Sequence, residues 1–123
     1  MKHHLIILLL SLTTTLAVGQ TYHLTFSVSF KKHYWESDYN KVSDKKINLI
    51  CQVFEDEGYI LVGDKSVNLT KVERNERGIT YWSKAADKTI FMFVYKEGLW
   101  TTIYKDGEGH MNCIESIVSS VDY

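Results

Sequence analysis

Histidine and cysteine are the residues of this chain whose spacing could do chemistry. His110 and Cys113 have the H-x2-C spacing of half a zinc site, and His23, His33 and Cys51 could in principle complete four ligands. A structural zinc site normally shows two such closely spaced pairs, and this sequence has one. We therefore predict no metal site, and no motif indicates a cofactor.

The two cysteines have a second possible use. Cys51 and Cys113 both lie among apolar neighbours, and an oxidising compartment would allow them to pair. A disulfide that closes a loop of this length would stabilise the fold by on the order of 4 kcal/mol. We expect the disulfide, with two buried free thiols as the alternative.

Catalytic motifs are missing from the sequence. No G-x-S-x-G, H-E-x-x-H or P-loop pattern occurs, and the serines alternate out of expected strands or lie in the tail. Such positions usually face solvent. The sequence thus predicts a protein that is not an enzyme.

Three aromatic residues stand in a charged stretch. Tyr34, Trp35 and Tyr39 lie within Lys31 to Lys46, where no clean strand or helix period is present. Tyr and Trp are enriched where surfaces bind partners. Either this stretch folds back and docks its rings on the core, or the three residues form a contact surface for a protein or ligand.

The first 19 residues have the pattern of a secretory signal peptide. Lys2 supplies a basic start, Leu5 to Leu12 is almost entirely apolar, and Ala17-Val18-Gly19 offers small residues before a cut at Gln20. The apolar segment is shorter than the roughly 20 residues that cross a bilayer, which argues against an uncleaved anchor. We expect a secreted or periplasmic protein with no stable membrane insertion after cleavage.

The net charge of the chain argues against two classes of partner. The formal net charge of the chain is −1, so no basic face is expected. Nucleic acids and anionic membrane surfaces normally require such a face, and we expect neither as a partner.

Apolar periodicity predicts one all-β domain over residues 20–123. Tyr22, Leu24, Phe26, Val28 and Phe30 alternate with polar residues, as in a strand with one buried and one solvated face. Lys31 to Lys46 is expected to be a long loop. Short apolar runs separated by Gly- and Asp-containing turns then follow from Ile47 to Tyr104.

About seven antiparallel strands in one core should form a meander that curls into a small barrel or folds over as a sandwich, because a flat sheet would leave exposed edges. The tail leaves two structures open. Ile114, Ile117, Val118 and Val121 have helical spacing, whereas Ile and Val favour strands, so a short C-terminal helix competes with a last strand.

These features rank the function classes. The first expectation is a non-catalytic binding or interaction module of the cell envelope that contacts an unknown protein or small apolar ligand. The second is a small-ligand carrier, lipocalin-like in general shape, with Tyr81, Phe93 and Trp100 lining a cavity. The third is an exported inhibitor of an envelope hydrolase.

Overall fold

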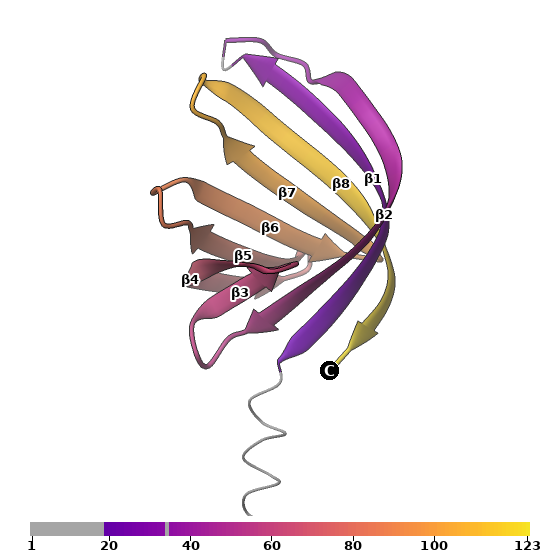
Figure 1. Cartoon of the computed structure of the whole chain (residues 1–123), viewed down its shortest axis with the longest axis vertical. Coiled ribbons are helices and arrows are strands. Elements are labelled where there is room, and N and C mark those ends of the chain that lie inside the picture. Colours follow the sequence, from indigo (N-terminus) through magenta and orange to yellow (C-terminus); the bar gives the residue numbers. More distant parts are fainter. Residues whose placement is uncertain (1–18, 34) are drawn as a thin grey trace, which may run out of the picture.

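The computed structural model describes residues 19–33 and 35–123, and this part of the chain is all-β (Figure 1). Eight strands follow one another without a helix between them: β1 (Gln20–His33), β2 (Asn40–Phe54), β3 (Tyr59–Val62), β4 (Lys65–Asn75), β5 (Gly78–Lys84), β6 (Ile90–Lys96), β7 (Leu99–Lys105) and β8 (His110–Asp122).

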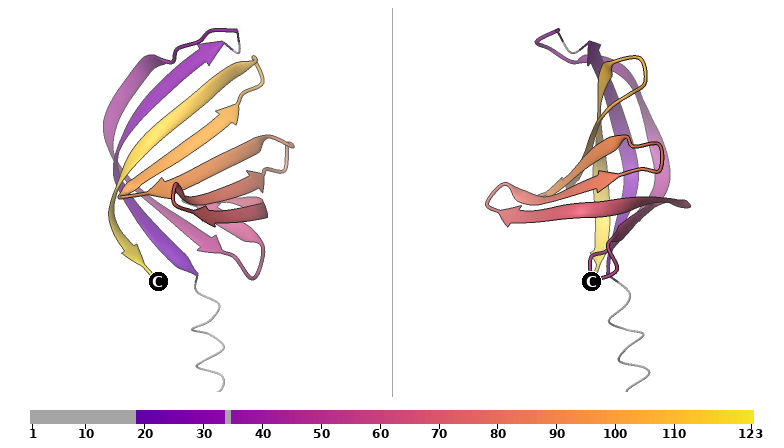
Figure 2. Two further views of the ribbon diagram at one scale, coloured as in Figure 1. Left: turned by 180° about the vertical axis from the view of Figure 1, so that it is seen from behind. Right: turned by 90° about the vertical axis from the view of Figure 1, so that its left-hand side faces the viewer.

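The strands form one closed antiparallel barrel. Each strand pairs with the next, and β8 returns to pair with β1 over nearly its whole length. The strands fan out so that β1, β2 and β8 follow the long axis while β4 to β6 lie across it (Figure 2). Closure pairs the edge strands that a flat sheet would leave exposed. The predicted all-β meander is confirmed, with eight strands rather than about seven.

The expected loop from Lys31 to Lys46 is mostly strand. β1 continues to His33 and β2 begins at Asn40, so the connection is confined to residues 34–39. The first half of β2 is exposed almost throughout, because it pairs with β1 alone; only Cys51 to Phe54 of β2 also pair with β3. A strand that is solvated on both faces has no alternation of polar and apolar residues, which is why the sequence pattern missed it.

A β-bulge in β1 makes the prediction of its buried face wrong for the second half of the strand. The register shifts between Leu24 and Phe26 in the pairings with both β2 and β8. Tyr22 and Leu24 are buried before the bulge, but Ser27 is the buried residue after it, and Phe26 is only half-buried. A bulge adds one residue to one strand, so every later side chain moves to the other face.

The tail is strand β8 and not a helix. Val118 pairs with Leu24 and Val121 with Tyr22, and both valines pack against the core. Ile117 is exposed instead. Register shifts in the pairing with β1 allow two core positions three residues apart, and this produces apolar spacing that resembles a helix.

Four aromatic side chains fill the closed part of the barrel. The Trp100 ring lies 4.8 Å from Tyr22, 5.4 Å from Phe93 and 5.9 Å from Tyr81, measured between centroids. All four are at most 2% exposed. Tyr81, Phe93 and Trp100 thus contact one another at the place where the carrier hypothesis expected a cavity.

Two tyrosine hydroxyls are buried with this cluster and form a hydrogen-bonded chain. Tyr81 donates to Oε1 of Gln20 at 3.1 Å, so its oxygen is free to accept from the Tyr22 hydroxyl at 2.8 Å. Burial, followed by the hydrogen bond to Tyr81, raises the pKa of Tyr22. Burial also raises the pKa of Tyr81. The chain lets polar groups enter the core without loss of hydrogen bonding.

The turn between β4 and β5 requires glycine. Gly78 has a φ of +109°, and a Cβ atom there would lie 2.3 Å from the carbonyl oxygen of Tyr95. Only a residue without a side chain allows β6 to approach this closely.

The expected disulfide is not formed, and both cysteines are free. Cys51 pairs with Tyr22 on β1, whereas Cys113 pairs with Phe30, eight residues further along that strand. At roughly 3.3 Å per residue this separation is about 26 Å. A disulfide requires Cα atoms within about 7 Å, so the barrel cannot bring the two thiols together.

We expect Trp100→Ala to destabilise the protein by about 3 to 5 kcal/mol, because it removes the ring at the centre of the core. Trp35→Ala, the same change at a residue that is 67% exposed, should change stability by no more than about 0.5 kcal/mol. Urea unfolding followed by circular dichroism measures both variants. An equal loss in Trp35→Ala would show that the hairpin ring is part of the core.

Thiol titration tests the free cysteines. In guanidinium without reductant, Ellman's reagent should find two thiols per chain, and a reductant should leave Tm unchanged. In the native protein we expect Cys51 to react far more slowly than Cys113, because burial removes its access and raises its pKa to about 12. A chain without titratable thiols would contradict the structure.

Candidate functional site

The tip of the β1–β2 hairpin carries the exposed aromatic residues. Trp35 is 67% exposed and Tyr39 is 36% exposed. Tyr34, the third candidate, lies outside the described residues. Of the two possibilities for this stretch, docking on the core is therefore excluded for Trp35, which is mostly exposed.

Local contacts fix the shape of this tip. The Trp35 ring stacks on His33 with a centroid distance of 4.3 Å and an angle of 6°. Glu36 accepts a 2.7 Å hydrogen bond from the His33 backbone N–H and donates its own N–H to the His33 carbonyl at 3.0 Å. Nζ of Lys32, also on β1, lies 4.8 Å above the ring of Tyr39, the residue that precedes β2. The aromatic surface is thus held on a hydrogen-bonded turn.

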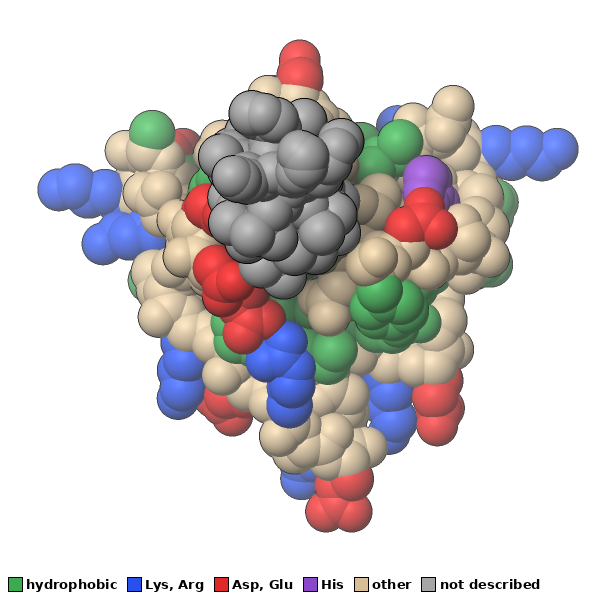
Figure 3. All heavy atoms as spheres, turned by 90° about the horizontal axis from the view of Figure 1, so that it is seen from below, with side chains coloured by type: hydrophobic (Ala, Val, Ile, Leu, Met, Phe, Trp, Pro, Cys, Tyr) green, Lys and Arg blue, Asp and Glu red, His purple; other side chains and the backbone are tan. Residues whose placement is uncertain are grey.

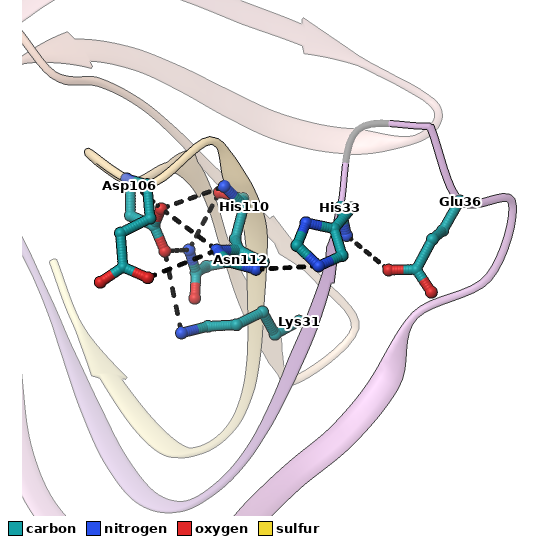
Figure 4. Close-up of polar contacts among 7 residues, drawn as sticks. Lys31, His33, Glu36, Asp106, His110 and Asn112 are labelled. Carbon is teal, nitrogen blue, oxygen red and sulfur yellow. Dashed lines mark hydrogen bonds and ion pairs between the residues drawn. The ribbon is translucent and has the colours of Figure 1, made fainter.

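The β7–β8 turn lies beside this tip and is organised by one carboxylate. Asp106 accepts hydrogen bonds from the Asn112 amide at 3.0 Å and from the backbone N–H groups of His110 and Glu108 at 3.0 and 2.9 Å (Figure 4). Nζ of Lys31 is 3.8 Å away. These donors, Asn112 first, lower the pKa of Asp106 to about 2.

Two histidines meet where the two turns adjoin. His33 of β1 and His110 of β8 are direct cross-strand partners, and their Nε2 atoms are 3.3 Å apart (Figure 4). Both carboxylates near Nδ1 of His110 come from the turn: Oδ1 of Asp106 at 3.8 Å and Oε2 of Glu108 at 3.9 Å. Sequence reasoning named both histidines but gave no reason to pair them, since they are far apart in the chain.

The other residues of the suggested zinc set are not brought together. His110 and Cys113 are three positions apart on a strand, so their side chains lie on opposite faces of the sheet. Cys51 is fully buried near the other end of β1, where His23 contacts Asp122 at 3.0 Å. Within residues 19–33 and 35–123 no group of three or more His, Cys, Asp or Glu side chains is placed to hold a metal ion.

A shallow, open depression of about 420 Å³ lies on the side of the barrel, away from the hairpin tip. Ile90, which is 59% exposed, stands at its edge. The depression is lined by Thr70, Lys71, Trp82, Ser83, Lys84 and Ile90. Its openness makes it a poor enclosure for a small molecule.

Comparison of the chain with protein-family models, curated proteins and solved structures finds no match. The part of the chain that the structure describes has no helix with the length and apolar character needed to cross a membrane.

The Asp106 carboxylate gives the domain a defined pH dependence. Because the folded pKa is lowered from 3.8 to about 2, its contribution to stability is present above about pH 4 and is lost as the pH falls toward 2. We expect Asp106→Asn to lose less stability than the wild type between pH 4 and 2, as measured by urea unfolding at stepped pH. Parallel curves for the two proteins would contradict this role.

Proposed function

We propose that this protein is an exported, non-catalytic interaction module of the cell envelope, and that it contacts a protein partner through the tip of the β1–β2 hairpin. The observation that carries the proposal is the exposed Trp35 side chain on a barrel whose closed part is filled by buried aromatic residues. A large indole in water is unfavourable, and Trp is among the residues most enriched at the energetic centres of protein interfaces.

The order of the tip supports a binding role. The Trp35 ring is already stacked on His33, and the backbone around it is tied by the two hydrogen bonds to Glu36. A surface that is ordered before binding loses less side-chain freedom on association. The tip lies at one end of the barrel beside the β7–β8 turn (Figure 1), and Trp35 is exposed there, so a partner can reach it.

The net charge supports a protein partner over a polyanion. Figure 3 shows the end of the barrel opposite the hairpin tip, where Lys and Arg side chains lie among those of Asp and Glu. The net charge is −1. An electrostatic footprint for nucleic acid would need a concentrated basic surface.

A structural cause accounts for each of the largest pKa displacements, which supports a module without catalysis. The pKa values of Tyr22 and Cys51 are raised by burial in the core, and that of Asp106 is lowered by the hydrogen bonds that close its turn. The pKa values of catalytic groups are usually shifted by charges and burial that converge on a cleft.

The proposal that the protein is exported depends only on the sequence of residues 1–19. Residues 1–18 lie outside the described residues, and the free thiols remove the argument that a disulfide would have supplied for an oxidising compartment. The signal-peptide pattern of residues 1–19 stays a prediction.

Site-specific crosslinking tests the contact surface. A photoreactive benzoylphenylalanine replaces Trp35 in the full chain, and a matched variant carries it at Ile90, which is similarly exposed at the edge of the side depression. In the cells that make the protein, we expect a discrete crosslinked product from position 35 and none from position 90. A product from position 90 alone would reject the hairpin surface in favour of the depression.

The dissociation constant is then measured with the partner that the crosslink identifies, in purified form. Trp35→Ala should weaken binding at least tenfold, as expected for a central interface residue, while Ile90→Ala should leave the dissociation constant unchanged. Equal affinities of Trp35→Ala and the wild type would contradict the proposal. The identity of the partner decides whether the module inhibits an envelope hydrolase.

A further inference from the structure

The outer side of the barrel carries an apolar face across β1, β8, β7 and β6, which follow one another in Figure 1. Ser27, Ser116 and Trp100 are direct cross-strand partners, and they are buried, as is Phe93 on β6. These side chains point into the barrel, so their neighbours along each strand point outward. The outward side chains are mostly apolar: Phe26, Val28 and Phe30 on β1, Met111, Cys113 and Ile117 on β8, Leu99 and Ile103 on β7, and Met92 and Val94 on β6.

The middle of this face is a row of direct cross-strand partners. Each of the four strands contributes one apolar residue to this central row: Phe30, Cys113, Ile103 and Met92. Within residues 19–33 and 35–123, none of them belongs to the buried core or to the side chains that pack against it. Ile117, further along β8, is 51% exposed. The described chain forms one barrel, so it supplies no second layer for this face.

The size of the face suits an interface. From β1 to β6 it spans three inter-strand spacings of about 4.8 Å, and from Phe26 to the level of Met111 it spans six residues of about 3.3 Å each. With the side chains at its borders, its projected area is about 400 Å². An apolar patch of this size marks an interaction site. Its accessible area exceeds the projection and approaches the roughly 800 Å² that each copy contributes to a standard interface.

We propose that two copies of this chain associate through the apolar face, with a two-fold axis along the central row. A symmetric contact of this kind requires a surface that complements itself. The axis places each residue of the central row against the same residue of the other copy, so apolar groups meet apolar groups. Two stacked sheets bury such faces in the same way inside a β-sandwich.

The charges on the face fit this axis and favour a second copy as the occupant. Glu115 lies two residues from Cys113 on one side of the central row. Met111 lies two residues from Cys113 on the other side, where it pairs with Lys32 and Lys105. Rotation about the central row brings Glu115 of each copy over Met111 of the other, between its two lysines. A carboxylate that is buried without a partner is costly, so this pairing also selects the register.

The dimer leaves the hairpin tip accessible. Trp35 stacks on His33, and the alternation along β1 places His33 on the inner face with Ser27. Ile90 lies at the start of β6, at a corner of the face where two twisted sheets diverge, so the expectation for a crosslink at position 90 is unchanged. The dimer does not depend on the protein contact proposed above.

Sedimentation equilibrium tests the dimer, with protein purified from cells that express the full chain. At about 100 μM we expect the mass of two chains, because interfaces of standard size reach micromolar affinity or better. Ile103→Lys places a charge on the axis and should weaken association by at least about tenfold. Ile50→Lys is the matched control: it makes the same change at a β2 isoleucine that is 40% exposed, and association should be unchanged. Circular dichroism checks that each variant is folded.

A charge exchange tests the register of the two copies. Glu115→Lys alone should weaken the dimer, because it brings like charges together at both ends of the contact. The further changes Lys32→Glu and Lys105→Glu should restore association by reversing each pair. A general loss of folding would not be repaired by this exchange.

Thiol crosslinking tests the position of the axis without a change to the apolar face. A bismaleimide with a spacer of about 10 Å should join two chains through Cys113, since stacked sheets lie about 10 Å apart. Cys113→Ser should abolish the product. Cys51→Ser should retain it, because Cys51 is fully buried in the core.

Three results would overturn the inference: a parent that remains monomeric at about 100 μM, a dimer that survives Ile103→Lys, or a bismaleimide product that persists in Cys113→Ser. The crosslink at position 35 joins the chain to a different protein and is read separately by mass. Failure of the dimer therefore leaves the protein-contact proposal standing, and the reverse also holds.

Discussion

The pairing of β1 with β8 is the interaction on which the rest of the structure depends. It joins the first and last strands, removes the two open edges of the meander, and encloses the ring of Trp100. Because β1 must pair on both sides while it curves around the core, it contains a bulge at which both registers shift. The same pairing places His33 opposite His110 at the far end of the strand.

Local patterns predicted the fold class because most strands bury one face in a common core. Turn residues between Ile47 and Tyr104 separate apolar runs that became β3 to β7. The pattern failed where a strand does not face the core in a regular way. The β2 arm of the hairpin from Asn40 to Lys46 is solvated, and the tail from Ile114 contains a register shift that resembles a helical period.

Non-local geometry accounts for what the sequence could not predict at the candidate site. Trp35 and Tyr39 were found from their own chemistry, because aromatic rings among charges are unusual wherever the chain places them. The meeting of His33 with His110 depends on strand register across the closure. The cysteine prediction failed for the same reason: Cys51 and Cys113 were judged by compartment and loop length, while their distance is set by their positions along β1.

Barrel closure also connects the hairpin tip to the folded core. The Trp35 ring lies on His33, and His33 in turn contacts His110, whose turn is held by the hydrogen bonds to Asp106. A two-stranded hairpin alone is marginally stable in water, so the tip needs a third element to keep its shape. Strand β8 supplies that element, and the exposed indole is therefore presented by a surface whose order comes from the same pairing that closes the barrel.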